Sequence, residues 1–489
     1  MLEPTLSPSQ YFLPRWQSEA EGTAPNAISP GLSLDGSSPS LTWRPDEFTL
    51  NQGYQEYKEE LRSLIFNTAN SAAPTRQGSP AGGAEQSDPN LTAYLDETHH
   101  RETAAILAVE GRTKYLRNYV SQVAPWLDMF DSDRAFGTQI TAMAQTSPAL
   151  LYAVLALSAR QMERKDGKKN SFDSLQLYQE AIRLLAPLLQ ERNVQIVPIC
   201  TILCCLEMMS ASAQDWRRHL EGCAALFDTF GVHGFSGGLL QAVFWCYARM
   251  DVCGALISDG TESTLVPPLQ WLVPGSEITD SHRLFHSTSH PDMHANYSVF
   301  LCSRVTELLA DRTRFVELGE QNGCSGPAYE DRWVALWEEL QAWMEERPAD
   351  FVPVKEVETS PFPEILFARW SAISGTQLHH TACILMLGMM PKPARIGMSL
   401  RLGTGGSAGS ALWHAKRVCG ISETNPHHGC LNNAIQPLWV AGRLLSHRAE
   451  HAVVVRLIWN IEALTGWGTS WRIADLEAVW GYRVKRNIS

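Results

Sequence analysis

The stretch SPALLYAVLALSARQMER (residues 147–164) predicts an amphipathic helix and sets the pattern that decides the fold. Ser147 and the proline after it are typical of a helix start, because serine caps unpaired backbone N–H groups and proline fits the first turn. Leu151, Val154 and Leu155 then fall on one face of a helix with 3.6 residues per turn. This apolar periodicity continues along most of the chain.

The segments that follow repeat the helical pattern. Residues 175–189 carry a stripe with alternating spacings of three and four, made of Leu175, Tyr178, Ile182, Leu185 and Leu189. A helix is predicted between Asp215 and Gly231, a glycine that marks its end, and residues 238–256 predict a central helix that is apolar on nearly all sides. Further helices are predicted near 297–315, 329–346, 363–389, 409–421, 432–446, 449–464 and 471–485.

The regions between these helices predict loops rather than strands. The three long ones cover residues 259–296, 391–408 and 422–431, and no run of alternating apolar residues indicates a sheet. The helix lengths follow no fixed period, which argues against a regular solenoid. We therefore expect an all-α fold, a large multi-helix, bundle-like array.

Composition indicates a large core in a reducing compartment. Of the 489 residues, 44% are hydrophobic and 19% are charged, and 16 are tryptophans, which suit thick helical packing. The 11 cysteines follow no disulfide framework, and several lie in apolar helical patterns. The N-terminus lacks the features of a secretory signal, and the longest apolar stretches, 196–206 and 382–390, are shorter than the ~20 residues of a membrane helix. We expect a soluble, intracellular protein with no membrane partner.

Residues 1–98 differ from the remainder of the chain. They are rich in Ser, Pro, Gly, Thr and Asn, and they hold 13 acidic and 5 basic residues, a net charge of −8. Such a composition predicts a disordered segment, with one short helix within 46–66. Its interleaved aromatic and acidic residues fit either a transactivating segment or a plain solvated linker. The predicted domains are thus residues 1–98 and an all-helical region over 99–489.

The charge pattern argues against nucleic-acid binding by the chain itself. The formal net charge is −12, whereas such proteins usually carry a basic surface. Two short basic clusters fit a solvated loop or a frayed end, and the second also fits a weak nuclear import signal: Arg164, Lys165, Lys168 and Lys169, then Arg483, Lys485 and Arg486. We assign no DNA-binding residue.

Motifs for catalysis are weak. Residues 405–409 fit the G-x-S-x-G pattern, and residues 403–408 fit a loose dinucleotide fingerprint, but the first needs a strand before its serine and the second needs a βαβ unit. A flexible Gly/Ser loop explains both. No aspartate-rich magnesium motif, P-loop or H-E-x-x-H occurs. We expect no catalytic residue, no cofactor and no enzyme activity.

Three groups of Cys and His residues are candidate metal ligands. The first is Cys200, Cys204 and His219, the second is Cys419, His427, His428 and Cys430, and the third comprises the pairs His99-His100 and His379-His380. Buried core cysteines explain the first group, the spacing of the second matches no known zinc module, and the pairs lack a third ligand nearby in sequence. No metal site is predicted.

Six blocks together resemble the regulatory domain of fungal binuclear zinc-cluster transcription factors, from about residue 99 to 485. They are SPALLYAVLALSARQMER (147–164), YQEAIRLLAPLL (178–189), WRRHLEGCAALFDTFG (216–231), QAVFWCYARMDVCGALI (241–257), LHHTACILML (378–387) and the tail from NAIQPLWVAGRLL (433–445) to RLIWNIEALTGWGTSWRIADLEAVWGY (456–482). The order and spacing of the blocks carry the resemblance. It implies an all-helical domain, action in the nucleus, and contacts with other regulators, coactivators or corepressors, including homo- or heterodimers.

The resemblance has one departure, which concerns DNA recognition. The family places it in a separate module with six cysteines and two zinc ions, whereas the first cysteine of this chain is Cys200. DNA contact is therefore expected to be indirect or through a module not in this chain. Either the gene model is truncated, with the cluster encoded upstream, or the protein is a cluster-less regulator that pairs with relatives or a repressor complex.

The expected mechanism is binding in apolar grooves between helices, by a partner helix or a small metabolite. Trp216, Arg249, Asp251 and Trp467 are candidates, because a polar group beside an aromatic ring suits either role; structural packing is the alternative. The rival functions are a helical enzyme with an unrecognised pocket and a cytoplasmic scaffold. An enzyme predicts a cavity with several converging acidic or histidine side chains.

Overall fold

The computed structural model describes residues 47–71, 89–167, 172–191, 193–210, 216–287, 290–394 and 409–484. Helices make up most of this part of the chain, which confirms the all-α prediction. The α-helices are α1 (Glu47–Leu50), α2 (Gln52–Ser71), α3 (Pro89–Ala108), α4 (Arg112–Asn118), α5 (Ala124–Leu127), α6 (Gln139–Met143), α7 (Pro148–Asp166), α8 (Asp173–Gln190), α9 (Ile196–Ser210), α10 (Trp216–Phe230), α11 (Gly238–Ile257), α12 (Ser281–His286), α13 (Pro291–Leu318), α14 (Gly326–Glu345), α15 (Trp370–Gly388), α17 (Ala411–Thr424), α18 (Ile435–Gly442), α19 (Arg448–Thr465) and α20 (Trp471–Trp480).

Short helical turns and one hairpin complete the described structure. A π-helical turn, η3 (Tyr119–Val123), joins α4 to α5. The 3-10 turns are η4 (Pro268–Trp271), η5 (Ile278–Asp280), η6 (Ala349–Phe351), η9 (His428–Cys430) and η10 (Asn432–Ala434). The two strands, β1 (Lys355–Val357) and β2 (Glu364–Leu366), pair antiparallel with Glu356 opposite Ile365.

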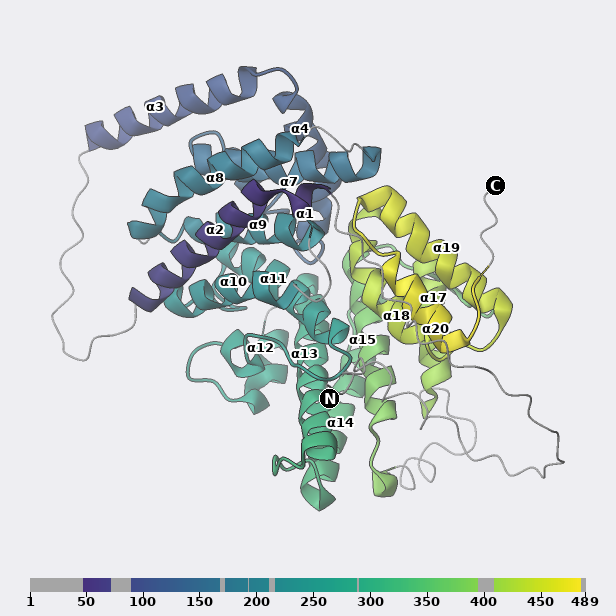
Figure 1. The fold of residues 1–489 in the computed structure, drawn as a ribbon. Helices are drawn as coiled ribbons and strands as arrows, with labels where there is room; N and C mark the ends of the chain where they lie inside the picture. Colours follow the sequence, from purple (N-terminus) through teal and green to yellow (C-terminus); the bar gives the residue numbers. More distant parts are fainter. Residues whose placement is uncertain are drawn as a thin grey trace, which may run out of the picture.

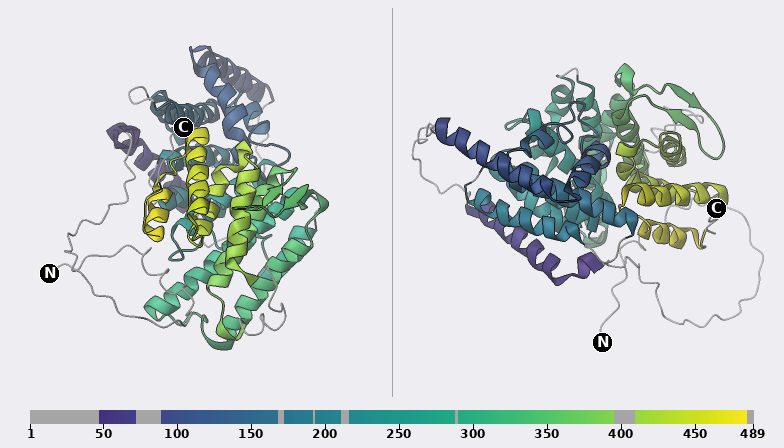
Figure 2. Two further views of the ribbon diagram at one scale, coloured as in Figure 1. Left: turned by 90° about the vertical axis from the view of Figure 1, so that its right-hand side faces the viewer. Right: turned by 90° about the horizontal axis from the view of Figure 1, so that it is seen from above.

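The helices form two groups with a set of longer helices between them. Helices α1 to α11 gather on one side and α17 to α20 on the other, while α13, α14 and α15 lie between and below them (Figure 1). The view from above shows the same division, with the α17–α20 group beside the first one (Figure 2). Helix α15 contacts α13, α14, α17 and α18, so it joins the central set to the C-terminal group.

Local sequence explains the start of α7 and the packing of α8 on it. The Ser147 Oγ accepts a hydrogen bond from the Leu150 N–H at 3.4 Å, which confirms the predicted N-cap. Gly167 ends α7 with a φ of 61°, a conformation that glycine adopts at low cost. Along α8 the predicted stripe is buried from Tyr178 to Leu189, whereas Leu175 is only partly buried.

Tryptophans fill the thick parts of the core, as the composition predicted. Trp245, Trp271, Trp333 and Trp343 are at most 2% exposed. Each indole N–H donates to a backbone carbonyl at 2.8–2.9 Å, so the burial leaves none of these donors unpaired. Helix α9 passes through the same core with every one of its residues buried.

Residues 47–71 form α1 and α2, so the short helix predicted within 46–66 is confirmed, and the ordered segment is longer than expected. Phe48 and Tyr54 are buried, and α2 packs against α8 and α10. The aromatic and aliphatic residues of this segment recur at helical spacing and cover an apolar face, which the average composition of the N-terminal region conceals. The predicted boundary at residue 98 lies inside α3. Residues 1–46 and 72–88 are outside the described part of the chain.

Two other predictions are corrected by tertiary contacts. Residues 364–366 form a strand rather than the start of a helix, because the Asn425 side chain accepts from the Phe367 N–H at 3.0 Å and donates to the Ile365 carbonyl at 2.7 Å. The predicted loop at 259–296 contains α12 and the start of α13. The stretch 403–408, with its glycine motifs, lies outside the described residues, as do Lys168, Lys169, Lys485 and Arg486.

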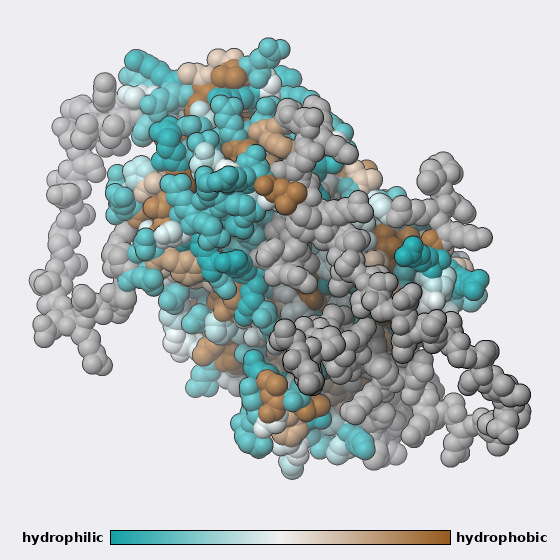
Figure 3. All heavy atoms as spheres, viewed as in Figure 1, coloured by the Kyte–Doolittle hydropathy of each residue, from teal (hydrophilic) through white to brown (hydrophobic). Residues whose placement is uncertain are grey.

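On the face seen in Figure 3, the described residues form no extended apolar surface. Its hydrophobic residues occur in small patches among hydrophilic ones (Figure 3). Single exposed apolar residues such as Leu318 are ordinary on folded proteins. None of the described helices combines the length and the apolar character that a membrane span requires.

Candidate functional site

A pocket of about 80 Å³, here called the central pocket, lies where α5, α7, α9 and α11 meet η9, η10 and α18. Its walls are mainly apolar, with Leu157, Met208 and Met250 from the first helical group and Ile435 from the second. Because residues more than 300 positions apart line it, the pocket depends on the contact between the two halves of the fold.

Arg249 places a charge in this apolar pocket. The residue is 6% exposed and its guanidinium donates to the carbonyls of Leu127 at 2.7 Å and Trp126 at 3.3 Å. The Phe130 ring lies 5.2 Å from the guanidinium carbon. Among the described residues no carboxylate lies within ion-pair distance of Arg249. A buried cation without a paired anion is costly, so an anionic group placed beside this guanidinium would be stabilised.

Asp128 is an acidic residue on which the charge of Arg249 acts, but its carboxylate is held by backbone groups. Its carboxylate accepts from the backbone N–H groups of Phe136 at 2.7 Å and Gly137 at 2.9 Å. Burial raises the pKa of Asp128 to about 7, although these hydrogen bonds and the charge of Arg249 act to lower it. Asp128 therefore shapes the turn after α5 and does not fill the pocket.

Two amides complete the polar groups of the central pocket. Asn432 and Asn433 line it from η10, and each has one buried amide atom without a hydrogen-bond partner among the described residues: Oδ1 of Asn432 and Nδ2 of Asn433. Leaving such a group unpaired costs roughly 1–3 kcal/mol. Apolar walls with a cation and two unsatisfied amides are typical of a small-molecule pocket.

Of the four residues predicted to bind a partner or metabolite, the fold brings two together. Trp467 lines the central pocket with Arg249, and its ring lies 6.4 Å from that of Trp126. Asp251 faces elsewhere: its carboxylate accepts from the N–H groups of Leu265 at 2.8 Å and Val266 at 3.1 Å, and burial raises its pKa to about 6. The side chain of Trp216 is outside the described part.

A second hollow of about 250 Å³, here called the C-terminal groove, lies between α15, α17, α18 and α19. Its floor is apolar, with Ile373, Leu438 and Ile461, and an ion pair between Glu423 and Arg456 stands at its rim. The groove is larger than the central pocket but carries no unpaired charge among the described residues.

The candidate ligands Cys200, Cys204 and His219, for which the sequence favoured core packing, lie together in the core. The His219 Nδ1 lies 2.7 Å from the Glu207 carboxylate, which also accepts from Tyr178, and the Cys204 thiol donates to the His219 carbonyl at 3.3 Å. Burial raises the pKa of the Cys200 thiol well above its usual value. Such thiols stay protonated, and the thiolate is the form that binds zinc.

The other candidate Cys and His ligands are also held by packing and hydrogen bonds within the fold. Cys419 is buried within α17, the Cys430 thiol donates to the Trp370 carbonyl at 3.4 Å, and His428 lies 2.9 Å from the Gln122 carbonyl. His380 faces His414, with 2.8 Å between the Nδ1 atoms, and burial lowers the pKa of His379 and His380 well below the usual value. No three ligand atoms of these groups meet among the described residues.

The geometry agrees with the family comparison. The family model described as "Fungal specific transcription factor domain" matches residues 114–484, about three quarters of the chain. The chain belongs to this family. The match begins within α4, so the fungal specific transcription factor domain of this chain includes the central pocket and the C-terminal groove, whereas α1, α2 and α3 precede it.

A curated relative supports the same family. "Transcription activator AMTR1" of Alternaria alternata is 23% identical over 344 residues, which cover 58% of this chain and 44% of the relative. The chain thus spans less than half of the length of the relative it matches. No solved structure matches the chain significantly.

One polar cluster of this fungal specific transcription factor domain was not predicted from the sequence. His282, His286 and Glu346 are the one set of three potential metal-binding groups that meets within the described residues. The two histidines are four positions apart, a spacing that places both on one helix face. The spacing was visible in the sequence, but residues 259–296 were predicted to be a loop, and the spacing indicates a shared face only in a helix.

Proposed function

We propose that the chain is a nuclear regulator of transcription whose helical domain acts by binding other molecules and catalyses no reaction. Membership of the fungal specific transcription factor domain family supports this, as does the similarity to a transcription activator. The observation that carries the mechanism is the central pocket, in which the buried guanidinium of Arg249 faces apolar walls.

The arrangement of titratable groups favours binding over catalysis. General acid–base catalysis needs two or more such groups that converge on one reacting centre. In the central pocket Arg249 is the charged side chain, and guanidinium holds its proton at any ordinary pH. The pair Glu207 and His219 lies beside the buried thiols of Cys200 and Cys204. Burial raises the pKa of Cys200, and a hydrogen bond with Cys223 raises that of Cys204, so both thiols hold their protons.

The chemistry of the central pocket favours a small organic anion with an apolar body. A carboxylate could accept two hydrogen bonds from the planar guanidinium of Arg249, and the amides of Asn432 and Asn433 would gain partners. The pocket volume of about 80 Å³ is below the usual range for drug-sized ligands, so the ligand is small or shifts flexible walls such as Met208 and Met250.

Binding there would change how the two helical groups sit against each other. The pocket walls come from both groups, so a ligand gains contacts with each and favours the arrangement that closes around it. The C-terminal groove, with its apolar floor and charged rim, has the character of a site for an amphipathic helix of another regulator, a coactivator, a corepressor or a second copy. DNA contact belongs to a separate module or to such a partner.

A reporter assay tests this function. The full chain is fused to a heterologous DNA-binding domain, and both reporter output and the location of a fluorescent tag are measured. We expect nuclear accumulation and activation or repression of at least about twofold. A fusion that is excluded from the nucleus and leaves the reporter unchanged would contradict the proposal.

The central pocket is tested with a matched pair of variants in the same fusion. Arg249→Met removes the charge from the pocket, while Arg183→Met removes an exposed arginine of α8. We expect the first to change reporter output and the second to leave it unaltered, at equal protein levels and equal helical circular dichroism. Equal output from both variants would remove the pocket from the mechanism.

A further inference from the structure

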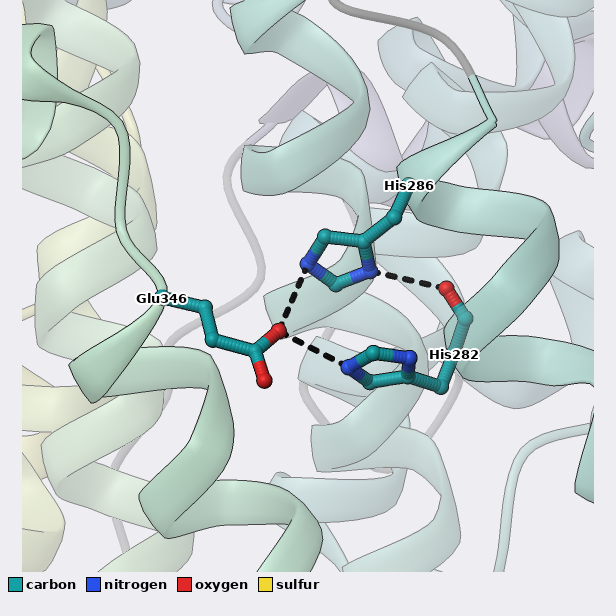
Figure 4. A group of neighbouring side chains, drawn as sticks. All are labelled: His282, His286 and Glu346. Carbon is teal, nitrogen blue, oxygen red and sulfur yellow. Dashed lines mark hydrogen bonds and ion pairs between the residues drawn. The ribbon is translucent and has the colours of Figure 1, made fainter.

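We propose that His282, His286 and Glu346 form a binding site for a divalent transition-metal ion of the zinc type. The two histidines lie one turn apart on α12, and their rings stack with centroids 4.3 Å apart. Both Nε2 atoms face the same oxygen of Glu346, at 2.8 Å for His282 and 3.3 Å for His286 (Figure 4). Glu346 follows the last residue of α14, so the site joins two elements that are distant in sequence.

The hydrogen bond of the other ring nitrogen prepares His286 to bind a metal. Its Nδ1 lies 2.7 Å from the His282 carbonyl, which can only accept, so Nδ1 carries a proton. In the neutral ring Nε2 then presents a lone pair to the Glu346 carboxylate, which also has only lone pairs. Two facing acceptors need a cation between them. Metal-bound histidines commonly donate their second N–H to a carbonyl in this way.

The spacing of the three ligand atoms suits a small ion. Tetrahedral zinc, with bonds of roughly 2.0–2.1 Å to nitrogen and oxygen, holds its ligand atoms about 3.3 Å apart. The His286–Glu346 distance already has this value, and the His282–Glu346 distance needs to open by about 0.5 Å. All three side chains are 31–48% exposed, so they can shift and an ion can reach them from solvent.

The ligand set selects the class of ion. Two imidazoles and one carboxylate suit zinc and its neighbours in the first transition series, whereas calcium and magnesium prefer oxygen ligands throughout. Three protein ligands leave a fourth position for water or for a group from another molecule.

The core beneath α12 holds the histidines in place. Phe285, between them in sequence, is 2% exposed and its ring stacks on Tyr297 of α13 with centroids 4.6 Å apart. This contact fixes the rotation of the short helix and turns both imidazoles toward Glu346. A bound ion would therefore tie α12 to the end of α14 and stabilise the segment between α11 and α13.

Metal titration of the full chain tests the site. After chelator treatment the protein is titrated with Zn²⁺ by calorimetry and with Co²⁺ by absorption, because Co²⁺ reports coordination number and any thiolate ligand. We expect one ion per chain, a tetrahedral Co²⁺ spectrum without a thiolate charge-transfer band, and a higher melting temperature with Zn²⁺.

Three variants locate the ion. His282→Ala with His286→Ala, and separately Glu346→Gln, are expected to weaken Zn²⁺ binding at least roughly tenfold and to remove the thermal shift. The control, His99→Ala with His100→Ala on α3, should bind as the parent does. Absence of one-to-one binding in the parent, a thiolate band, or unchanged affinity in the first two variants would overturn the proposal. In that case an imidazolium–carboxylate ion pair accounts for the cluster.

Discussion

Replacing Gly420 with alanine should destabilise the protein, because α17 approaches the β-hairpin too closely for a side chain. A Cβ at this position would lie 2.2 Å from the Pro363 carbonyl oxygen and 3.1 Å from the Pro363 Cγ. The first distance is about 1 Å below a normal carbon–oxygen contact, and the atom that obstructs it belongs to the backbone. The hairpin would have to move, together with its bonds to Asn425.

The size of the effect follows from two opposing terms. Alanine inside a helix gains about 1 kcal/mol over glycine through its higher helix propensity. Forcing an extra methyl group into a packed contact costs typically ~1–3 kcal/mol, and the cost lies at the upper end where backbone must shift. We expect Gly420→Ala to lower the free energy of unfolding by about 2 kcal/mol.

Gly254→Ala provides the matched control, since it also lies within a helix, α11. Its Cβ would meet Leu220 Cδ1 at 3.5 Å, an ordinary contact, so this variant should gain about 0.5–1 kcal/mol. Urea unfolding followed by circular dichroism at 222 nm measures both variants. If Gly420→Ala raised the midpoint as Gly254→Ala does, the close approach of α17 to the hairpin would be refuted.

Two further predictions concern the N-terminal half. Phe48→Ala removes a fully buried ring that stacks with the Arg160 guanidinium at 4.0 Å, and it should destabilise the local structure by about 3–5 kcal/mol. The loss should appear as faster tryptic cleavage of α2 at Lys58 and Arg62. Cleavage at the parental rate would contradict the packing of α1. The pKa of Asp128 is raised to about 7 in the folded protein, which therefore holds a proton that the unfolded chain releases near pH 4. The stability that this group contributes is present at low pH and is lost as the pH rises toward 7, by at most ~4 kcal/mol. Asp128→Asn should reduce the pH dependence of the urea midpoint between about pH 4 and 7. An unchanged pH dependence would exclude this titration.

Local sequence signals predicted the helices that local interactions define. Ser147 and the stripe through Tyr178 and Ile182 act within one or two turns, so spacing alone reveals α7 and α8. The strand at 364–366 was not predictable in this way, because Asn425, about 60 residues further along the chain, holds it. A short helix was predicted where α2 lies, but its docking against α8 and α10 was not, because those contacts join residues far apart in the sequence.

The same distinction applies to the candidate site. Arg249 and Trp467 were predicted because a polar group close to an aromatic ring can be recognised in the local sequence. Asn432 and Asn433 could not be recognised from the sequence, because η10 and α11, some 180 residues apart, line one pocket only in the folded chain. The His282–His286 pair carried a readable spacing, but Glu346 joins it from the end of another helix.

The docking of α2 has a practical consequence for anyone who trims the gene. A fragment cut at the start of the family match would lose the amphipathic cover that Leu61 and Ile65 provide. Water would then reach the Tyr178–Glu207–His219 chain of hydrogen bonds. The newly exposed apolar surface of α8 and α10 would favour aggregation during expression. Researchers who seek crystals should begin upstream of Glu47.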